Sequence, residues 1–115
     1  MNKTFNPVKG LLISSVLVSG LALTANVSAD GADIYSQTCV ACHGADGKGA
    51  LPGTPDFTDK HGRLSQEDTI LLDHMEHGFQ SPGSFMAMPP KGGNSSLTRH
   101  DLEDVLKYIR TTFGG

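Results

Sequence analysis

Two long segments of this chain, residues 44–58 and 80–96, hold glycine and proline so often that neither can form a regular helix or strand. The stretches beside them carry helical patterns, and no stretch alternates apolar and polar residues as a half-buried strand does. A small domain with two such loops has little apolar core, so it often needs a disulfide, a metal or a cofactor to fill the space that the loops surround. The sequence therefore predicts an all-α domain built around something bulky.

Three segments have the spacing of apolar residues that is typical of helices: residues 33–40, 65–77 and 98–112. The second begins with a capping pattern, Ser65 followed by Asp68, and a glycine stands where the helix should end. The third begins in the same way with Thr98 and Asp101, and its apolar residues recur at i, i+3, i+4 and i+7. These three segments are the expected main helices.

The amino terminus has the three parts of a secretory signal. Two lysines are the only charges before Asp30, residues 11–24 form an apolar run, and small residues precede Asp30 where signal cleavage requires them. We expect residues 1–29 to be removed and residues 30–115 to form one domain. An uncleaved membrane anchor is the alternative, although the run is shorter than the about 20 apolar residues that span a bilayer. The mature chain is expected to be soluble, outside the cytoplasm and not stably inserted in a membrane.

The charge balance argues against a nucleic-acid partner. The chain has 12 Asp and Glu against 9 Lys and Arg, a formal net charge of −3. A surface that follows phosphates needs the opposite sign. The same balance favours a protein partner with a basic docking patch.

The pentapeptide Cys39-Val40-Ala41-Cys42-His43 has the spacing typical of covalent c-type haem attachment. Two thiols three residues apart lie on one helical turn, where both can add to the vinyl groups of one haem edge. The next residue, a histidine, then faces the iron, for which imidazole is a good ligand. Such haems are attached outside the cytoplasm, which agrees with export. We predict one haem c, held by two thioethers, with His43 as a ligand of its iron.

Other interpretations of the two cysteines are weaker. A redox disulfide of the thioredoxin type needs a mixed sheet, which the sequence does not indicate. A zinc site formed by Cys39, Cys42, His74 and His77 has an unusually tight histidine spacing and no further cysteine to support it. A plain structural disulfide leaves His43 without a role.

The second axial ligand is expected to be a methionine, which raises the reduction potential of a haem iron. Met75 lies on the apolar face of a predicted helix, where packing in the core is the simpler explanation. Met86 and Met88 lie in the second loop, and Pro89 favours an extended strap at Met88, so Met88 is preferred over Met86. A distal histidine stays open as the alternative. Its candidates are His61, His74, His77 and His100.

These features resemble the class I c-type cytochromes over nearly the whole of residues 30–115. The stretch Met88-Pro89-Pro90-Lys91-Gly92-Gly93 is similar to the methionine loop of a subgroup of small bacterial monohaem cytochromes. In that family the methionine before the proline is the axial ligand, which the resemblance implies for Met88. It also implies the small cytochrome c fold, in which three main helices and long loops surround one haem.

The resemblance implies further contacts. A proline carbonyl in the first loop usually accepts the proton of the proximal histidine, and Pro55, followed by the apolar Phe57, is the best match, with Pro52 second. The family also packs an early helix crosswise on the last one. The residues expected at that crossing are Gly31, Tyr35, Val105, Tyr108 and Ile109.

The function implied is that of a soluble periplasmic electron carrier, not an enzyme. Two strong axial ligands leave no open position at the iron, and redox protein partners are expected to dock transiently at the thioether edge. The alternatives are a haem subunit, or a haem enzyme or sensor domain, of a larger redox system. Five apolar residues are expected to line the haem pocket: Phe57, Leu64, Leu71, Leu72 and Phe85.

Overall fold

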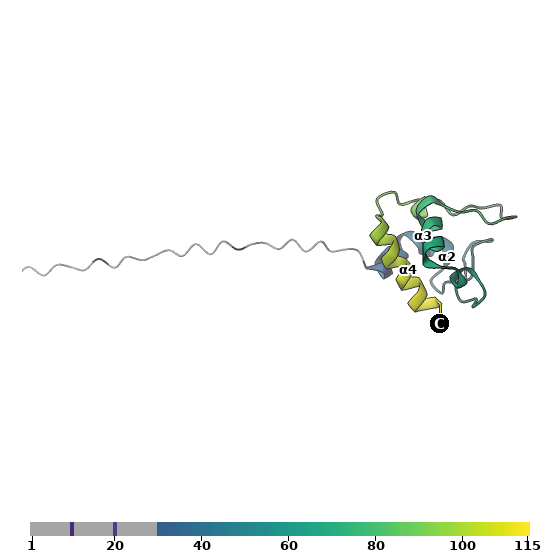
Figure 1. Ribbon diagram of the computed structural model, residues 1–115, viewed down its shortest axis with the longest axis horizontal. Helices are drawn as coiled ribbons and strands as arrows, with labels where there is room; N and C mark the ends of the chain where they lie inside the picture. Colours follow the sequence, from purple (N-terminus) through teal and green to yellow (C-terminus); the bar gives the residue numbers. More distant parts are fainter. Residues whose placement is uncertain (1–9, 11–19, 21–29) are drawn as a thin grey trace, which may run out of the picture.

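A computed structural model describes residues 10, 20 and 30–115 of the chain. The predicted signal, residues 1–29, lies outside the described residues apart from positions 10 and 20. The helical elements in chain order are α1 (Gly31–Ile34), the π-helical turn η1 (Tyr35–Cys39), α2 (Val40–His43), the 3-10 turn η2 (Arg63–Ser65), α3 (Asp68–His77), the 3-10 turn η3 (Pro90–Gly93) and α4 (Arg99–Phe113). Within residues 30–115 the only β pairing is one antiparallel bridge, so the predicted all-α fold is confirmed. Figure 1 shows loops projecting from the domain on the side away from α4.

The first helical segment is longer than predicted and contains a wide turn. The sequence predicts a helix over residues 33–40, and the structure extends it to residues 31–43. In η1 the Val40 N–H donates to the carbonyl of Tyr35, five residues earlier, which is wider than an α-helical turn. Gly44, with a φ of 80°, ends the segment in a conformation that glycine adopts without strain.

Helix α3 begins after Glu67, so the predicted N-cap at Ser65 is wrong. The Ser65 hydroxyl donates instead to the Gly62 carbonyl at 2.7 Å, within η2. The Asp68 carboxylate, which the capping pattern pairs with Ser65, accepts a hydrogen bond from Arg110 Nε of α4 at 2.6 Å. A local turn and a contact with another helix therefore replace the cap.

Helix α4 begins as predicted, with a complete capping box. The Thr98 hydroxyl accepts from the Asp101 N–H at 3.2 Å, and the Asp101 carboxylate accepts from the Thr98 N–H at 2.7 Å. The apolar face of this helix is buried along its length. Its buried residues are Leu102, Val105, Leu106 and Ile109.

Helix α1 lies against α4 at very close range. A Cβ on Gly31 would stand 2.2 Å from the Asp104 carbonyl oxygen and 3.0 Å from Tyr108 Cβ, so only glycine permits this approach. Tyr35 packs on Tyr108 with ring centroids 5.4 Å apart, and Val105 has no exposed surface. The crossing of the early and last helices is therefore confirmed.

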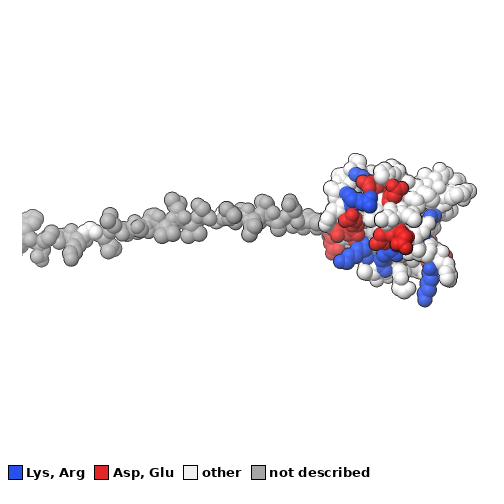
Figure 2. Space-filling model, in the orientation of Figure 1, with Lys and Arg blue, Asp and Glu red and all other residues white. Residues whose placement is uncertain are grey.

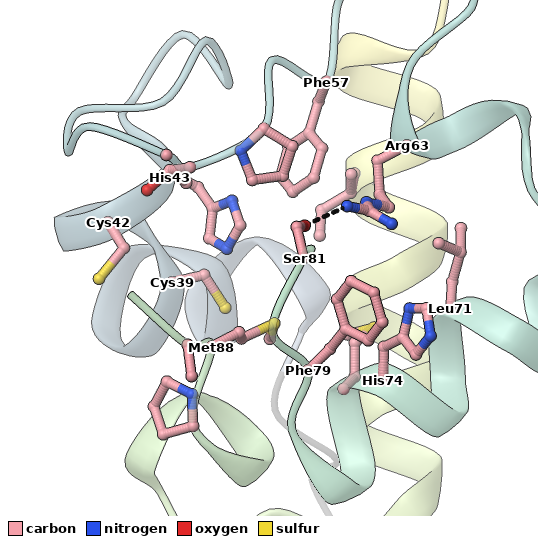
Figure 3. A pocket seen from close by; sticks show the side chains of 18 of the residues that line it. Cys39, Cys42, His43, Phe57, Arg63, Leu71, His74, Phe79, Ser81 and Met88 are labelled. Carbon is pink, nitrogen blue, oxygen red and sulfur yellow. Dashed lines mark hydrogen bonds between the residues drawn. The ribbon is translucent and has the colours of Figure 1, made fainter. Parts of the chain in front are cut away.

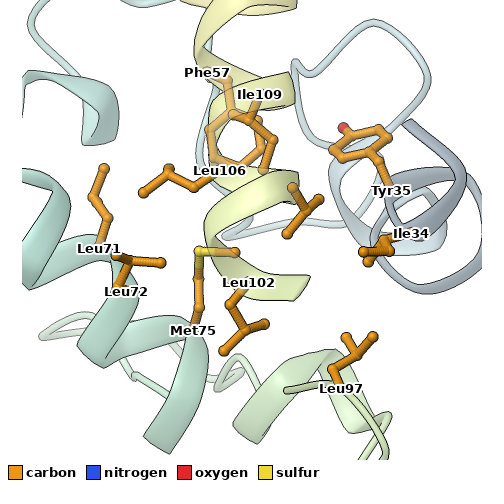
Figure 4. Close-up of a cluster of buried hydrophobic side chains, with 11 residues drawn as sticks. Ile34, Tyr35, Phe57, Leu71, Leu72, Met75, Leu97, Leu102, Leu106 and Ile109 are labelled. Carbon is orange, nitrogen blue, oxygen red and sulfur yellow. The ribbon is translucent and has the colours of Figure 1, made fainter. Parts of the chain in front are cut away.

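The apolar core lies between the first helical segment, α3 and α4 (Figure 4). Its buried members are Ile34, Tyr35, Phe57, Leu71, Leu72, Met75, Leu97, Leu102, Val105, Leu106 and Ile109. Most of them belong to the helical elements, and only Phe57 and Leu97 lie outside these elements. The core is small, and the space between it and the loops becomes the functional site.

Replacement of Gly31 by alanine should separate α1 from α4. The new Cβ meets the Asp104 carbonyl, and overpacking of this kind costs about 1–3 kcal/mol of unfolding free energy. Urea denaturation of the wild type and Gly31→Ala measures this difference. Gly115→Ala is the control, because a Cβ at Gly115 has nothing within 4 Å. Equal stability of Gly31→Ala and the wild type would contradict the close crossing.

Candidate functional site

A cavity opens between the first helical segment, α3, α4 and the two loops. Its empty space, including the open mouth, is about 1120 Å³, and most of its wall is apolar. Figure 3 shows the two cysteines and His43 on one side, with Arg63, Leu71 and His74 on the other. All six residues predicted to hold a cofactor line it: Cys39, Cys42, His43, Pro55, Phe57 and Met88.

Cys39, Cys42 and His43 reach the cavity from successive turns of the first helical segment. Cys39 is the last residue of η1, and the other two lie at the end of α2. Both thiols are free, and Cys42 is exposed while Cys39 is half-buried. Burial, with a smaller effect of Cys42, raises the pKa of Cys39 to about 11, so its thiol is protonated at neutral pH.

His43 is buried in a neutral form that suits metal binding. Burial lowers the pKa of its imidazole to about 4. The ring stacks on Phe57, with ring centroids 4.6 Å apart and an angle of 12° between the planes. The Phe57 ring in turn stacks on Phe113 at the end of α4, with centroids 6.3 Å apart. His43 Nδ1 is buried and has no hydrogen-bond partner, which is uncommon for a buried polar atom.

The hydrogen bond predicted between His43 and a proline carbonyl is not formed, because Nδ1 has no partner. Pro55 nevertheless lines the cavity beside Phe57, whereas Pro52 does not. The loop is held in place there by the Phe57 N–H, which donates to the Gly47 carbonyl at 2.8 Å. Pro55 therefore stays a candidate contact of the cofactor, without the predicted bond to His43.

Tyr35 contacts the cysteine–histidine motif at both ends. Its carbonyl accepts from the Val40 N–H, and its hydroxyl donates to the Gly44 carbonyl at 2.7 Å. Burial, with smaller effects of Cys39 and other neighbours, raises the pKa of the Tyr35 phenol to about 12. One buried side chain therefore links this motif to the contact between α1 and α4.

Met88 enters the cavity from a strap that is paired with the end of α3. The Phe79 N–H donates to the Met88 carbonyl at 3.0 Å, and the Met88 N–H donates to the Phe79 carbonyl at 2.8 Å. Gly78 has a φ of 83°, and a Cβ there would lie 2.9 Å from the Met88 carbonyl oxygen, so the strap packs closely because this residue is glycine. Figure 3 shows the thioether of Met88 pointing into the same space as the imidazole of His43.

The other two methionines occupy different environments. Met75 is buried and belongs to the apolar core, as predicted, and its side chain also reaches the cavity wall. Met86 lies at the mouth and is 36% exposed. Met88 instead packs against the core and is fixed by the bridge to Phe79, which favours Met88 over Met86 as the residue that faces His43.

Three of the five apolar residues predicted for the pocket line it: Phe57, Leu64 and Leu71. Leu72 is buried in the adjacent core and does not line the cavity. The prediction for Phe85 is wrong, because its side chain is 78% exposed and outside the cavity. The Ser84 hydroxyl donates to the Met86 carbonyl at 2.8 Å, which fixes a tight turn with Phe85 at its exposed centre.

Of the four histidines considered as distal ligands, only His74 lines the cavity. Its ring stacks on Phe79 at 3.8 Å between centroids, and Figure 3 shows Phe79 between His74 and Met88. His74 Nδ1 is buried without a partner. His77 and His100 lie on the surface beside aspartates of their own helices, and His61 is exposed.

Arg63 lies on the side of the cavity away from the cysteines, and Ser81 lies between Arg63 and His43 in the view of Figure 3. Arg63 donates to the Ser81 hydroxyl at 2.8 Å, and its guanidinium lies 4.8 Å from the centre of the Phe79 ring. Among the lysines and arginines of the described residues, Arg63 alone lines the cavity. No sequence pattern separates Arg63 from the other basic residues, because its contacts join segments far apart in the chain.

The alternative interpretations of the cysteines receive no support. In the part of the chain that the structure describes, no group of three or more His, Cys, Asp and Glu is placed to hold a metal ion, so the zinc site is not assembled. The thiols are not joined in a disulfide.

No helix within the described residues combines the length and apolar character needed to cross a bilayer.

The residues around the cavity fit a covalently held haem. Cys39 and Cys42 supply two thiols at one side, and His43 supplies a neutral imidazole. The thioether of Met88 faces the same space, and the remaining wall is mostly apolar. Arg63, on the far side, is suited to the carboxylates that a porphyrin carries opposite its thioether edge.

Comparisons with known proteins agree with this geometry. A family model for cytochrome c matches residues 28–113. The cytochrome c-555 of Prosthecochloris aestuarii is 32% identical over 83 residues, which are 70% of this chain and 83% of that protein. The cytochrome c4 of Pseudomonas aeruginosa is 31% identical over 101 residues, covering 86% of this chain and 46% of that protein.

Subunits of larger complexes are similar as well. The cytochrome c subunit of a quinone alcohol dehydrogenase from Gluconacetobacter polyoxogenes is 30% identical over 118 residues. The match covers 98% of this chain but only 23% of that subunit's length. The chain therefore spans about a quarter of that relative's length.

Replacement of Tyr35 by phenylalanine should lower the unfolding free energy at neutral pH. The loss relative to the wild type should be smaller in strong alkali. Loss of the bond to Gly44 costs about 1 kcal/mol. The pKa of tyrosine is about 10 in the unfolded chain. Burial raises the pKa of Tyr35 to about 12 in the folded protein. The stability that this shift supplies is complete below about pH 10 and is lost as the pH rises towards 12. Urea unfolding of both proteins at pH 7 and pH 11 measures the difference between their unfolding free energies. A difference that is larger at pH 11 would contradict the burial of the Tyr35 phenol.

Proposed function

Because the chain belongs to the cytochrome c family and holds a covalently bound haem c through Cys39 and Cys42, we propose that it is an exported, soluble carrier of single electrons. Haem-based electron transfer is the general activity of this family. The haem supplies an iron that gains and loses one electron. The chain supplies its attachment, its two axial ligands, an apolar surrounding and a contact surface for redox partners.

The observation that carries this proposal is that His43 and Met88 line the same cavity. The neutral imidazole comes from the first helical segment, and the thioether comes from the strap after α3. A nitrogen and a sulfur ligand on the two faces would leave no position at the iron for a substrate. That arrangement supports electron transfer over catalysis at the metal.

The walls of the cavity have separate roles in the proposal. Phe57 orients the imidazole of His43 by stacking, and Pro55 contacts the cofactor from the same loop. Arg63 and Ser81, which are joined by a hydrogen bond, would bind the carboxylates of the haem. The buried apolar residues keep water from the iron, which keeps its surroundings similar in both oxidation states.

The proposal includes the location of the protein. Residues 1–29 direct export and are cleaved, and residues 30–115 form the monohaem domain in the periplasm. The three-part signal pattern and the small residues before Asp30 support this division. Partners dock transiently, as is usual in short-lived redox encounters.

A permanent haem subunit of a larger redox complex is the second candidate. The matches to a dehydrogenase subunit and to oxidase subunits favour it, since the chain corresponds to 23% and 32% of the lengths of two such relatives. Purification from the periplasm as a free monomer would support the carrier. Purification only in a stable complex would support the subunit.

Met88→His should lower the reduction potential and remove the sulfur-to-iron absorption band of the oxidised protein, because imidazole stabilises ferric iron more than a thioether does. Potentiometric titration with absorption spectra measures both. Met86→Leu is the control, since Met86 is half exposed at the mouth and should leave potential and band unchanged. Loss of the band in Met86→Leu, with an unchanged Met88→His, would mean that the wrong methionine is assigned.

Carbon monoxide should bind the reduced wild-type protein slowly and weakly at neutral pH, because both axial positions are taken by protein ligands. Absorption spectra recorded under carbon monoxide measure this. Rapid and tight binding would instead indicate an open position, as in a haem enzyme or a gas sensor. Met88→Ala is the matched control, because removal of the thioether should make binding rapid.

A further inference from the structure

The loop between Phe79 and Met88 projects from the domain (Figure 1). It exposes apolar side chains at its tip. Phe85 is 78% exposed, more than any other large apolar side chain of the described residues, and Met86 is 36% exposed. The Gln80 side chain donates to the Ser84 carbonyl at 2.7 Å, so the loop has internal bonds as well as the bridge at its base. A structured turn therefore keeps the Phe85 side chain exposed to solvent.

The first loop extends this tip into a patch. Leu51 is 39% exposed. A Cβ on Gly53 would lie 3.1 Å from the Ser84 hydroxyl oxygen, so the two loops meet near their tips. Gly53 and Met86 also line the mouth of the haem cavity. We call Leu51, Gly53, Phe85 and Met86 the apolar rim.

Charged residues are absent from the segments that form the apolar rim. Residues 49–55 and 78–90 contain no Asp, Glu, Lys or Arg. On the face that Figure 2 shows, the upper projection carries no charged side chains, whereas charges of both signs gather over the helices. Arg63 touches the base of the second loop, but its guanidinium is engaged with Ser81 and Phe79. The net negative charge of the chain is therefore not a property of this surface.

We propose that the apolar rim is the docking surface for a redox protein that presents an uncharged, apolar recess, and that Phe85 is its anchor. The inference rests on the proposed function, because the rim borders the mouth of the haem cavity. The lack of charge on the rim selects a partner surface that also lacks charge, since an unpaired charge buried against it would lose its hydration. This replaces the basic partner patch that the composition favours.

The physical consequences differ from those of charge-guided docking. Exposed charges attract over a distance that salt reduces, whereas burial of apolar surface depends little on salt. A single aromatic side chain at the centre of a small interface often supplies much of the binding energy. Docking at the apolar rim should therefore resist salt and depend on Phe85.

Voltammetry of the exported holoprotein on coated gold electrodes tests this. A methyl-terminated alkanethiol coating serves as the apolar, uncharged surface, and carboxylate- and amine-terminated coatings serve as charged ones. We expect binding to the methyl coating that changes less than about twofold between low and high salt, and about a tenfold loss of affinity in Phe85→Ser. Ile70→Ser is the matched control, because Ile70 is 44% exposed on α3, and it should stay within about twofold of the wild type.

Strongest binding to a charged coating, or equal losses in Phe85→Ser and Ile70→Ser, would overturn the inference. Binding to phosphatidylcholine vesicles would also overturn it, because the apolar rim would then contact a membrane. A dimer in sedimentation equilibrium that Phe85→Ser dissociates would overturn it too, because the rim would then contact a second copy of the chain. The potential of each protein in free solution separates the two proposals. A reversible one-electron wave there upholds the carrier even if the rim fails, and its absence overturns the carrier itself.

Discussion

Attachment through Cys39 and Cys42 would fix one edge of the haem at the end of the first helical segment, and the rest of the domain is arranged around that point. Cys39 and Cys42 lie where η1 passes into α2, and Tyr35 contacts both ends of the motif through its carbonyl and its hydroxyl. Tyr35 also packs against α4, where Gly31 permits the closest approach. Tyr35 thus links the attachment point to the crossing of α1 and α4.

The haem site explains why this domain has two long loops. A loop in a small domain loses much conformational entropy unless it gains contacts. The first loop brings Phe57 under the imidazole of His43, and the second brings Met88 to the same cavity. Gly78 lets the second loop turn back directly from α3. Each loop is ordered against the space that the haem fills, and the helices alone bury only a small core.

The sequence predicts those parts of the molecule that local patterns determine. The capping box of α4, its apolar face and the cysteine–histidine motif are each contained in a short window, and each occurs as predicted. The cap at Ser65 fails because Asp68 pairs with Arg110, a residue far away in the chain. Phe85 is apolar yet exposed, because hydrogen bonds of Ser84 set the turn that carries it. Arg63 and His74 enter the site through contacts across the cavity that no local pattern contains.

Covalent attachment of one haem by two thioethers is the claim on which the cavity, the loops and the proposed carrier all depend. A pyridine haemochrome spectrum of the exported protein, recorded before and after extraction with acidified organic solvent, tests it most directly. Two thioethers predict the spectrum of a haem with both vinyl groups saturated, and the colour should stay with the chain. A colourless protein, or a spectrum with intact vinyl groups whose colour passes into the solvent, would contradict it.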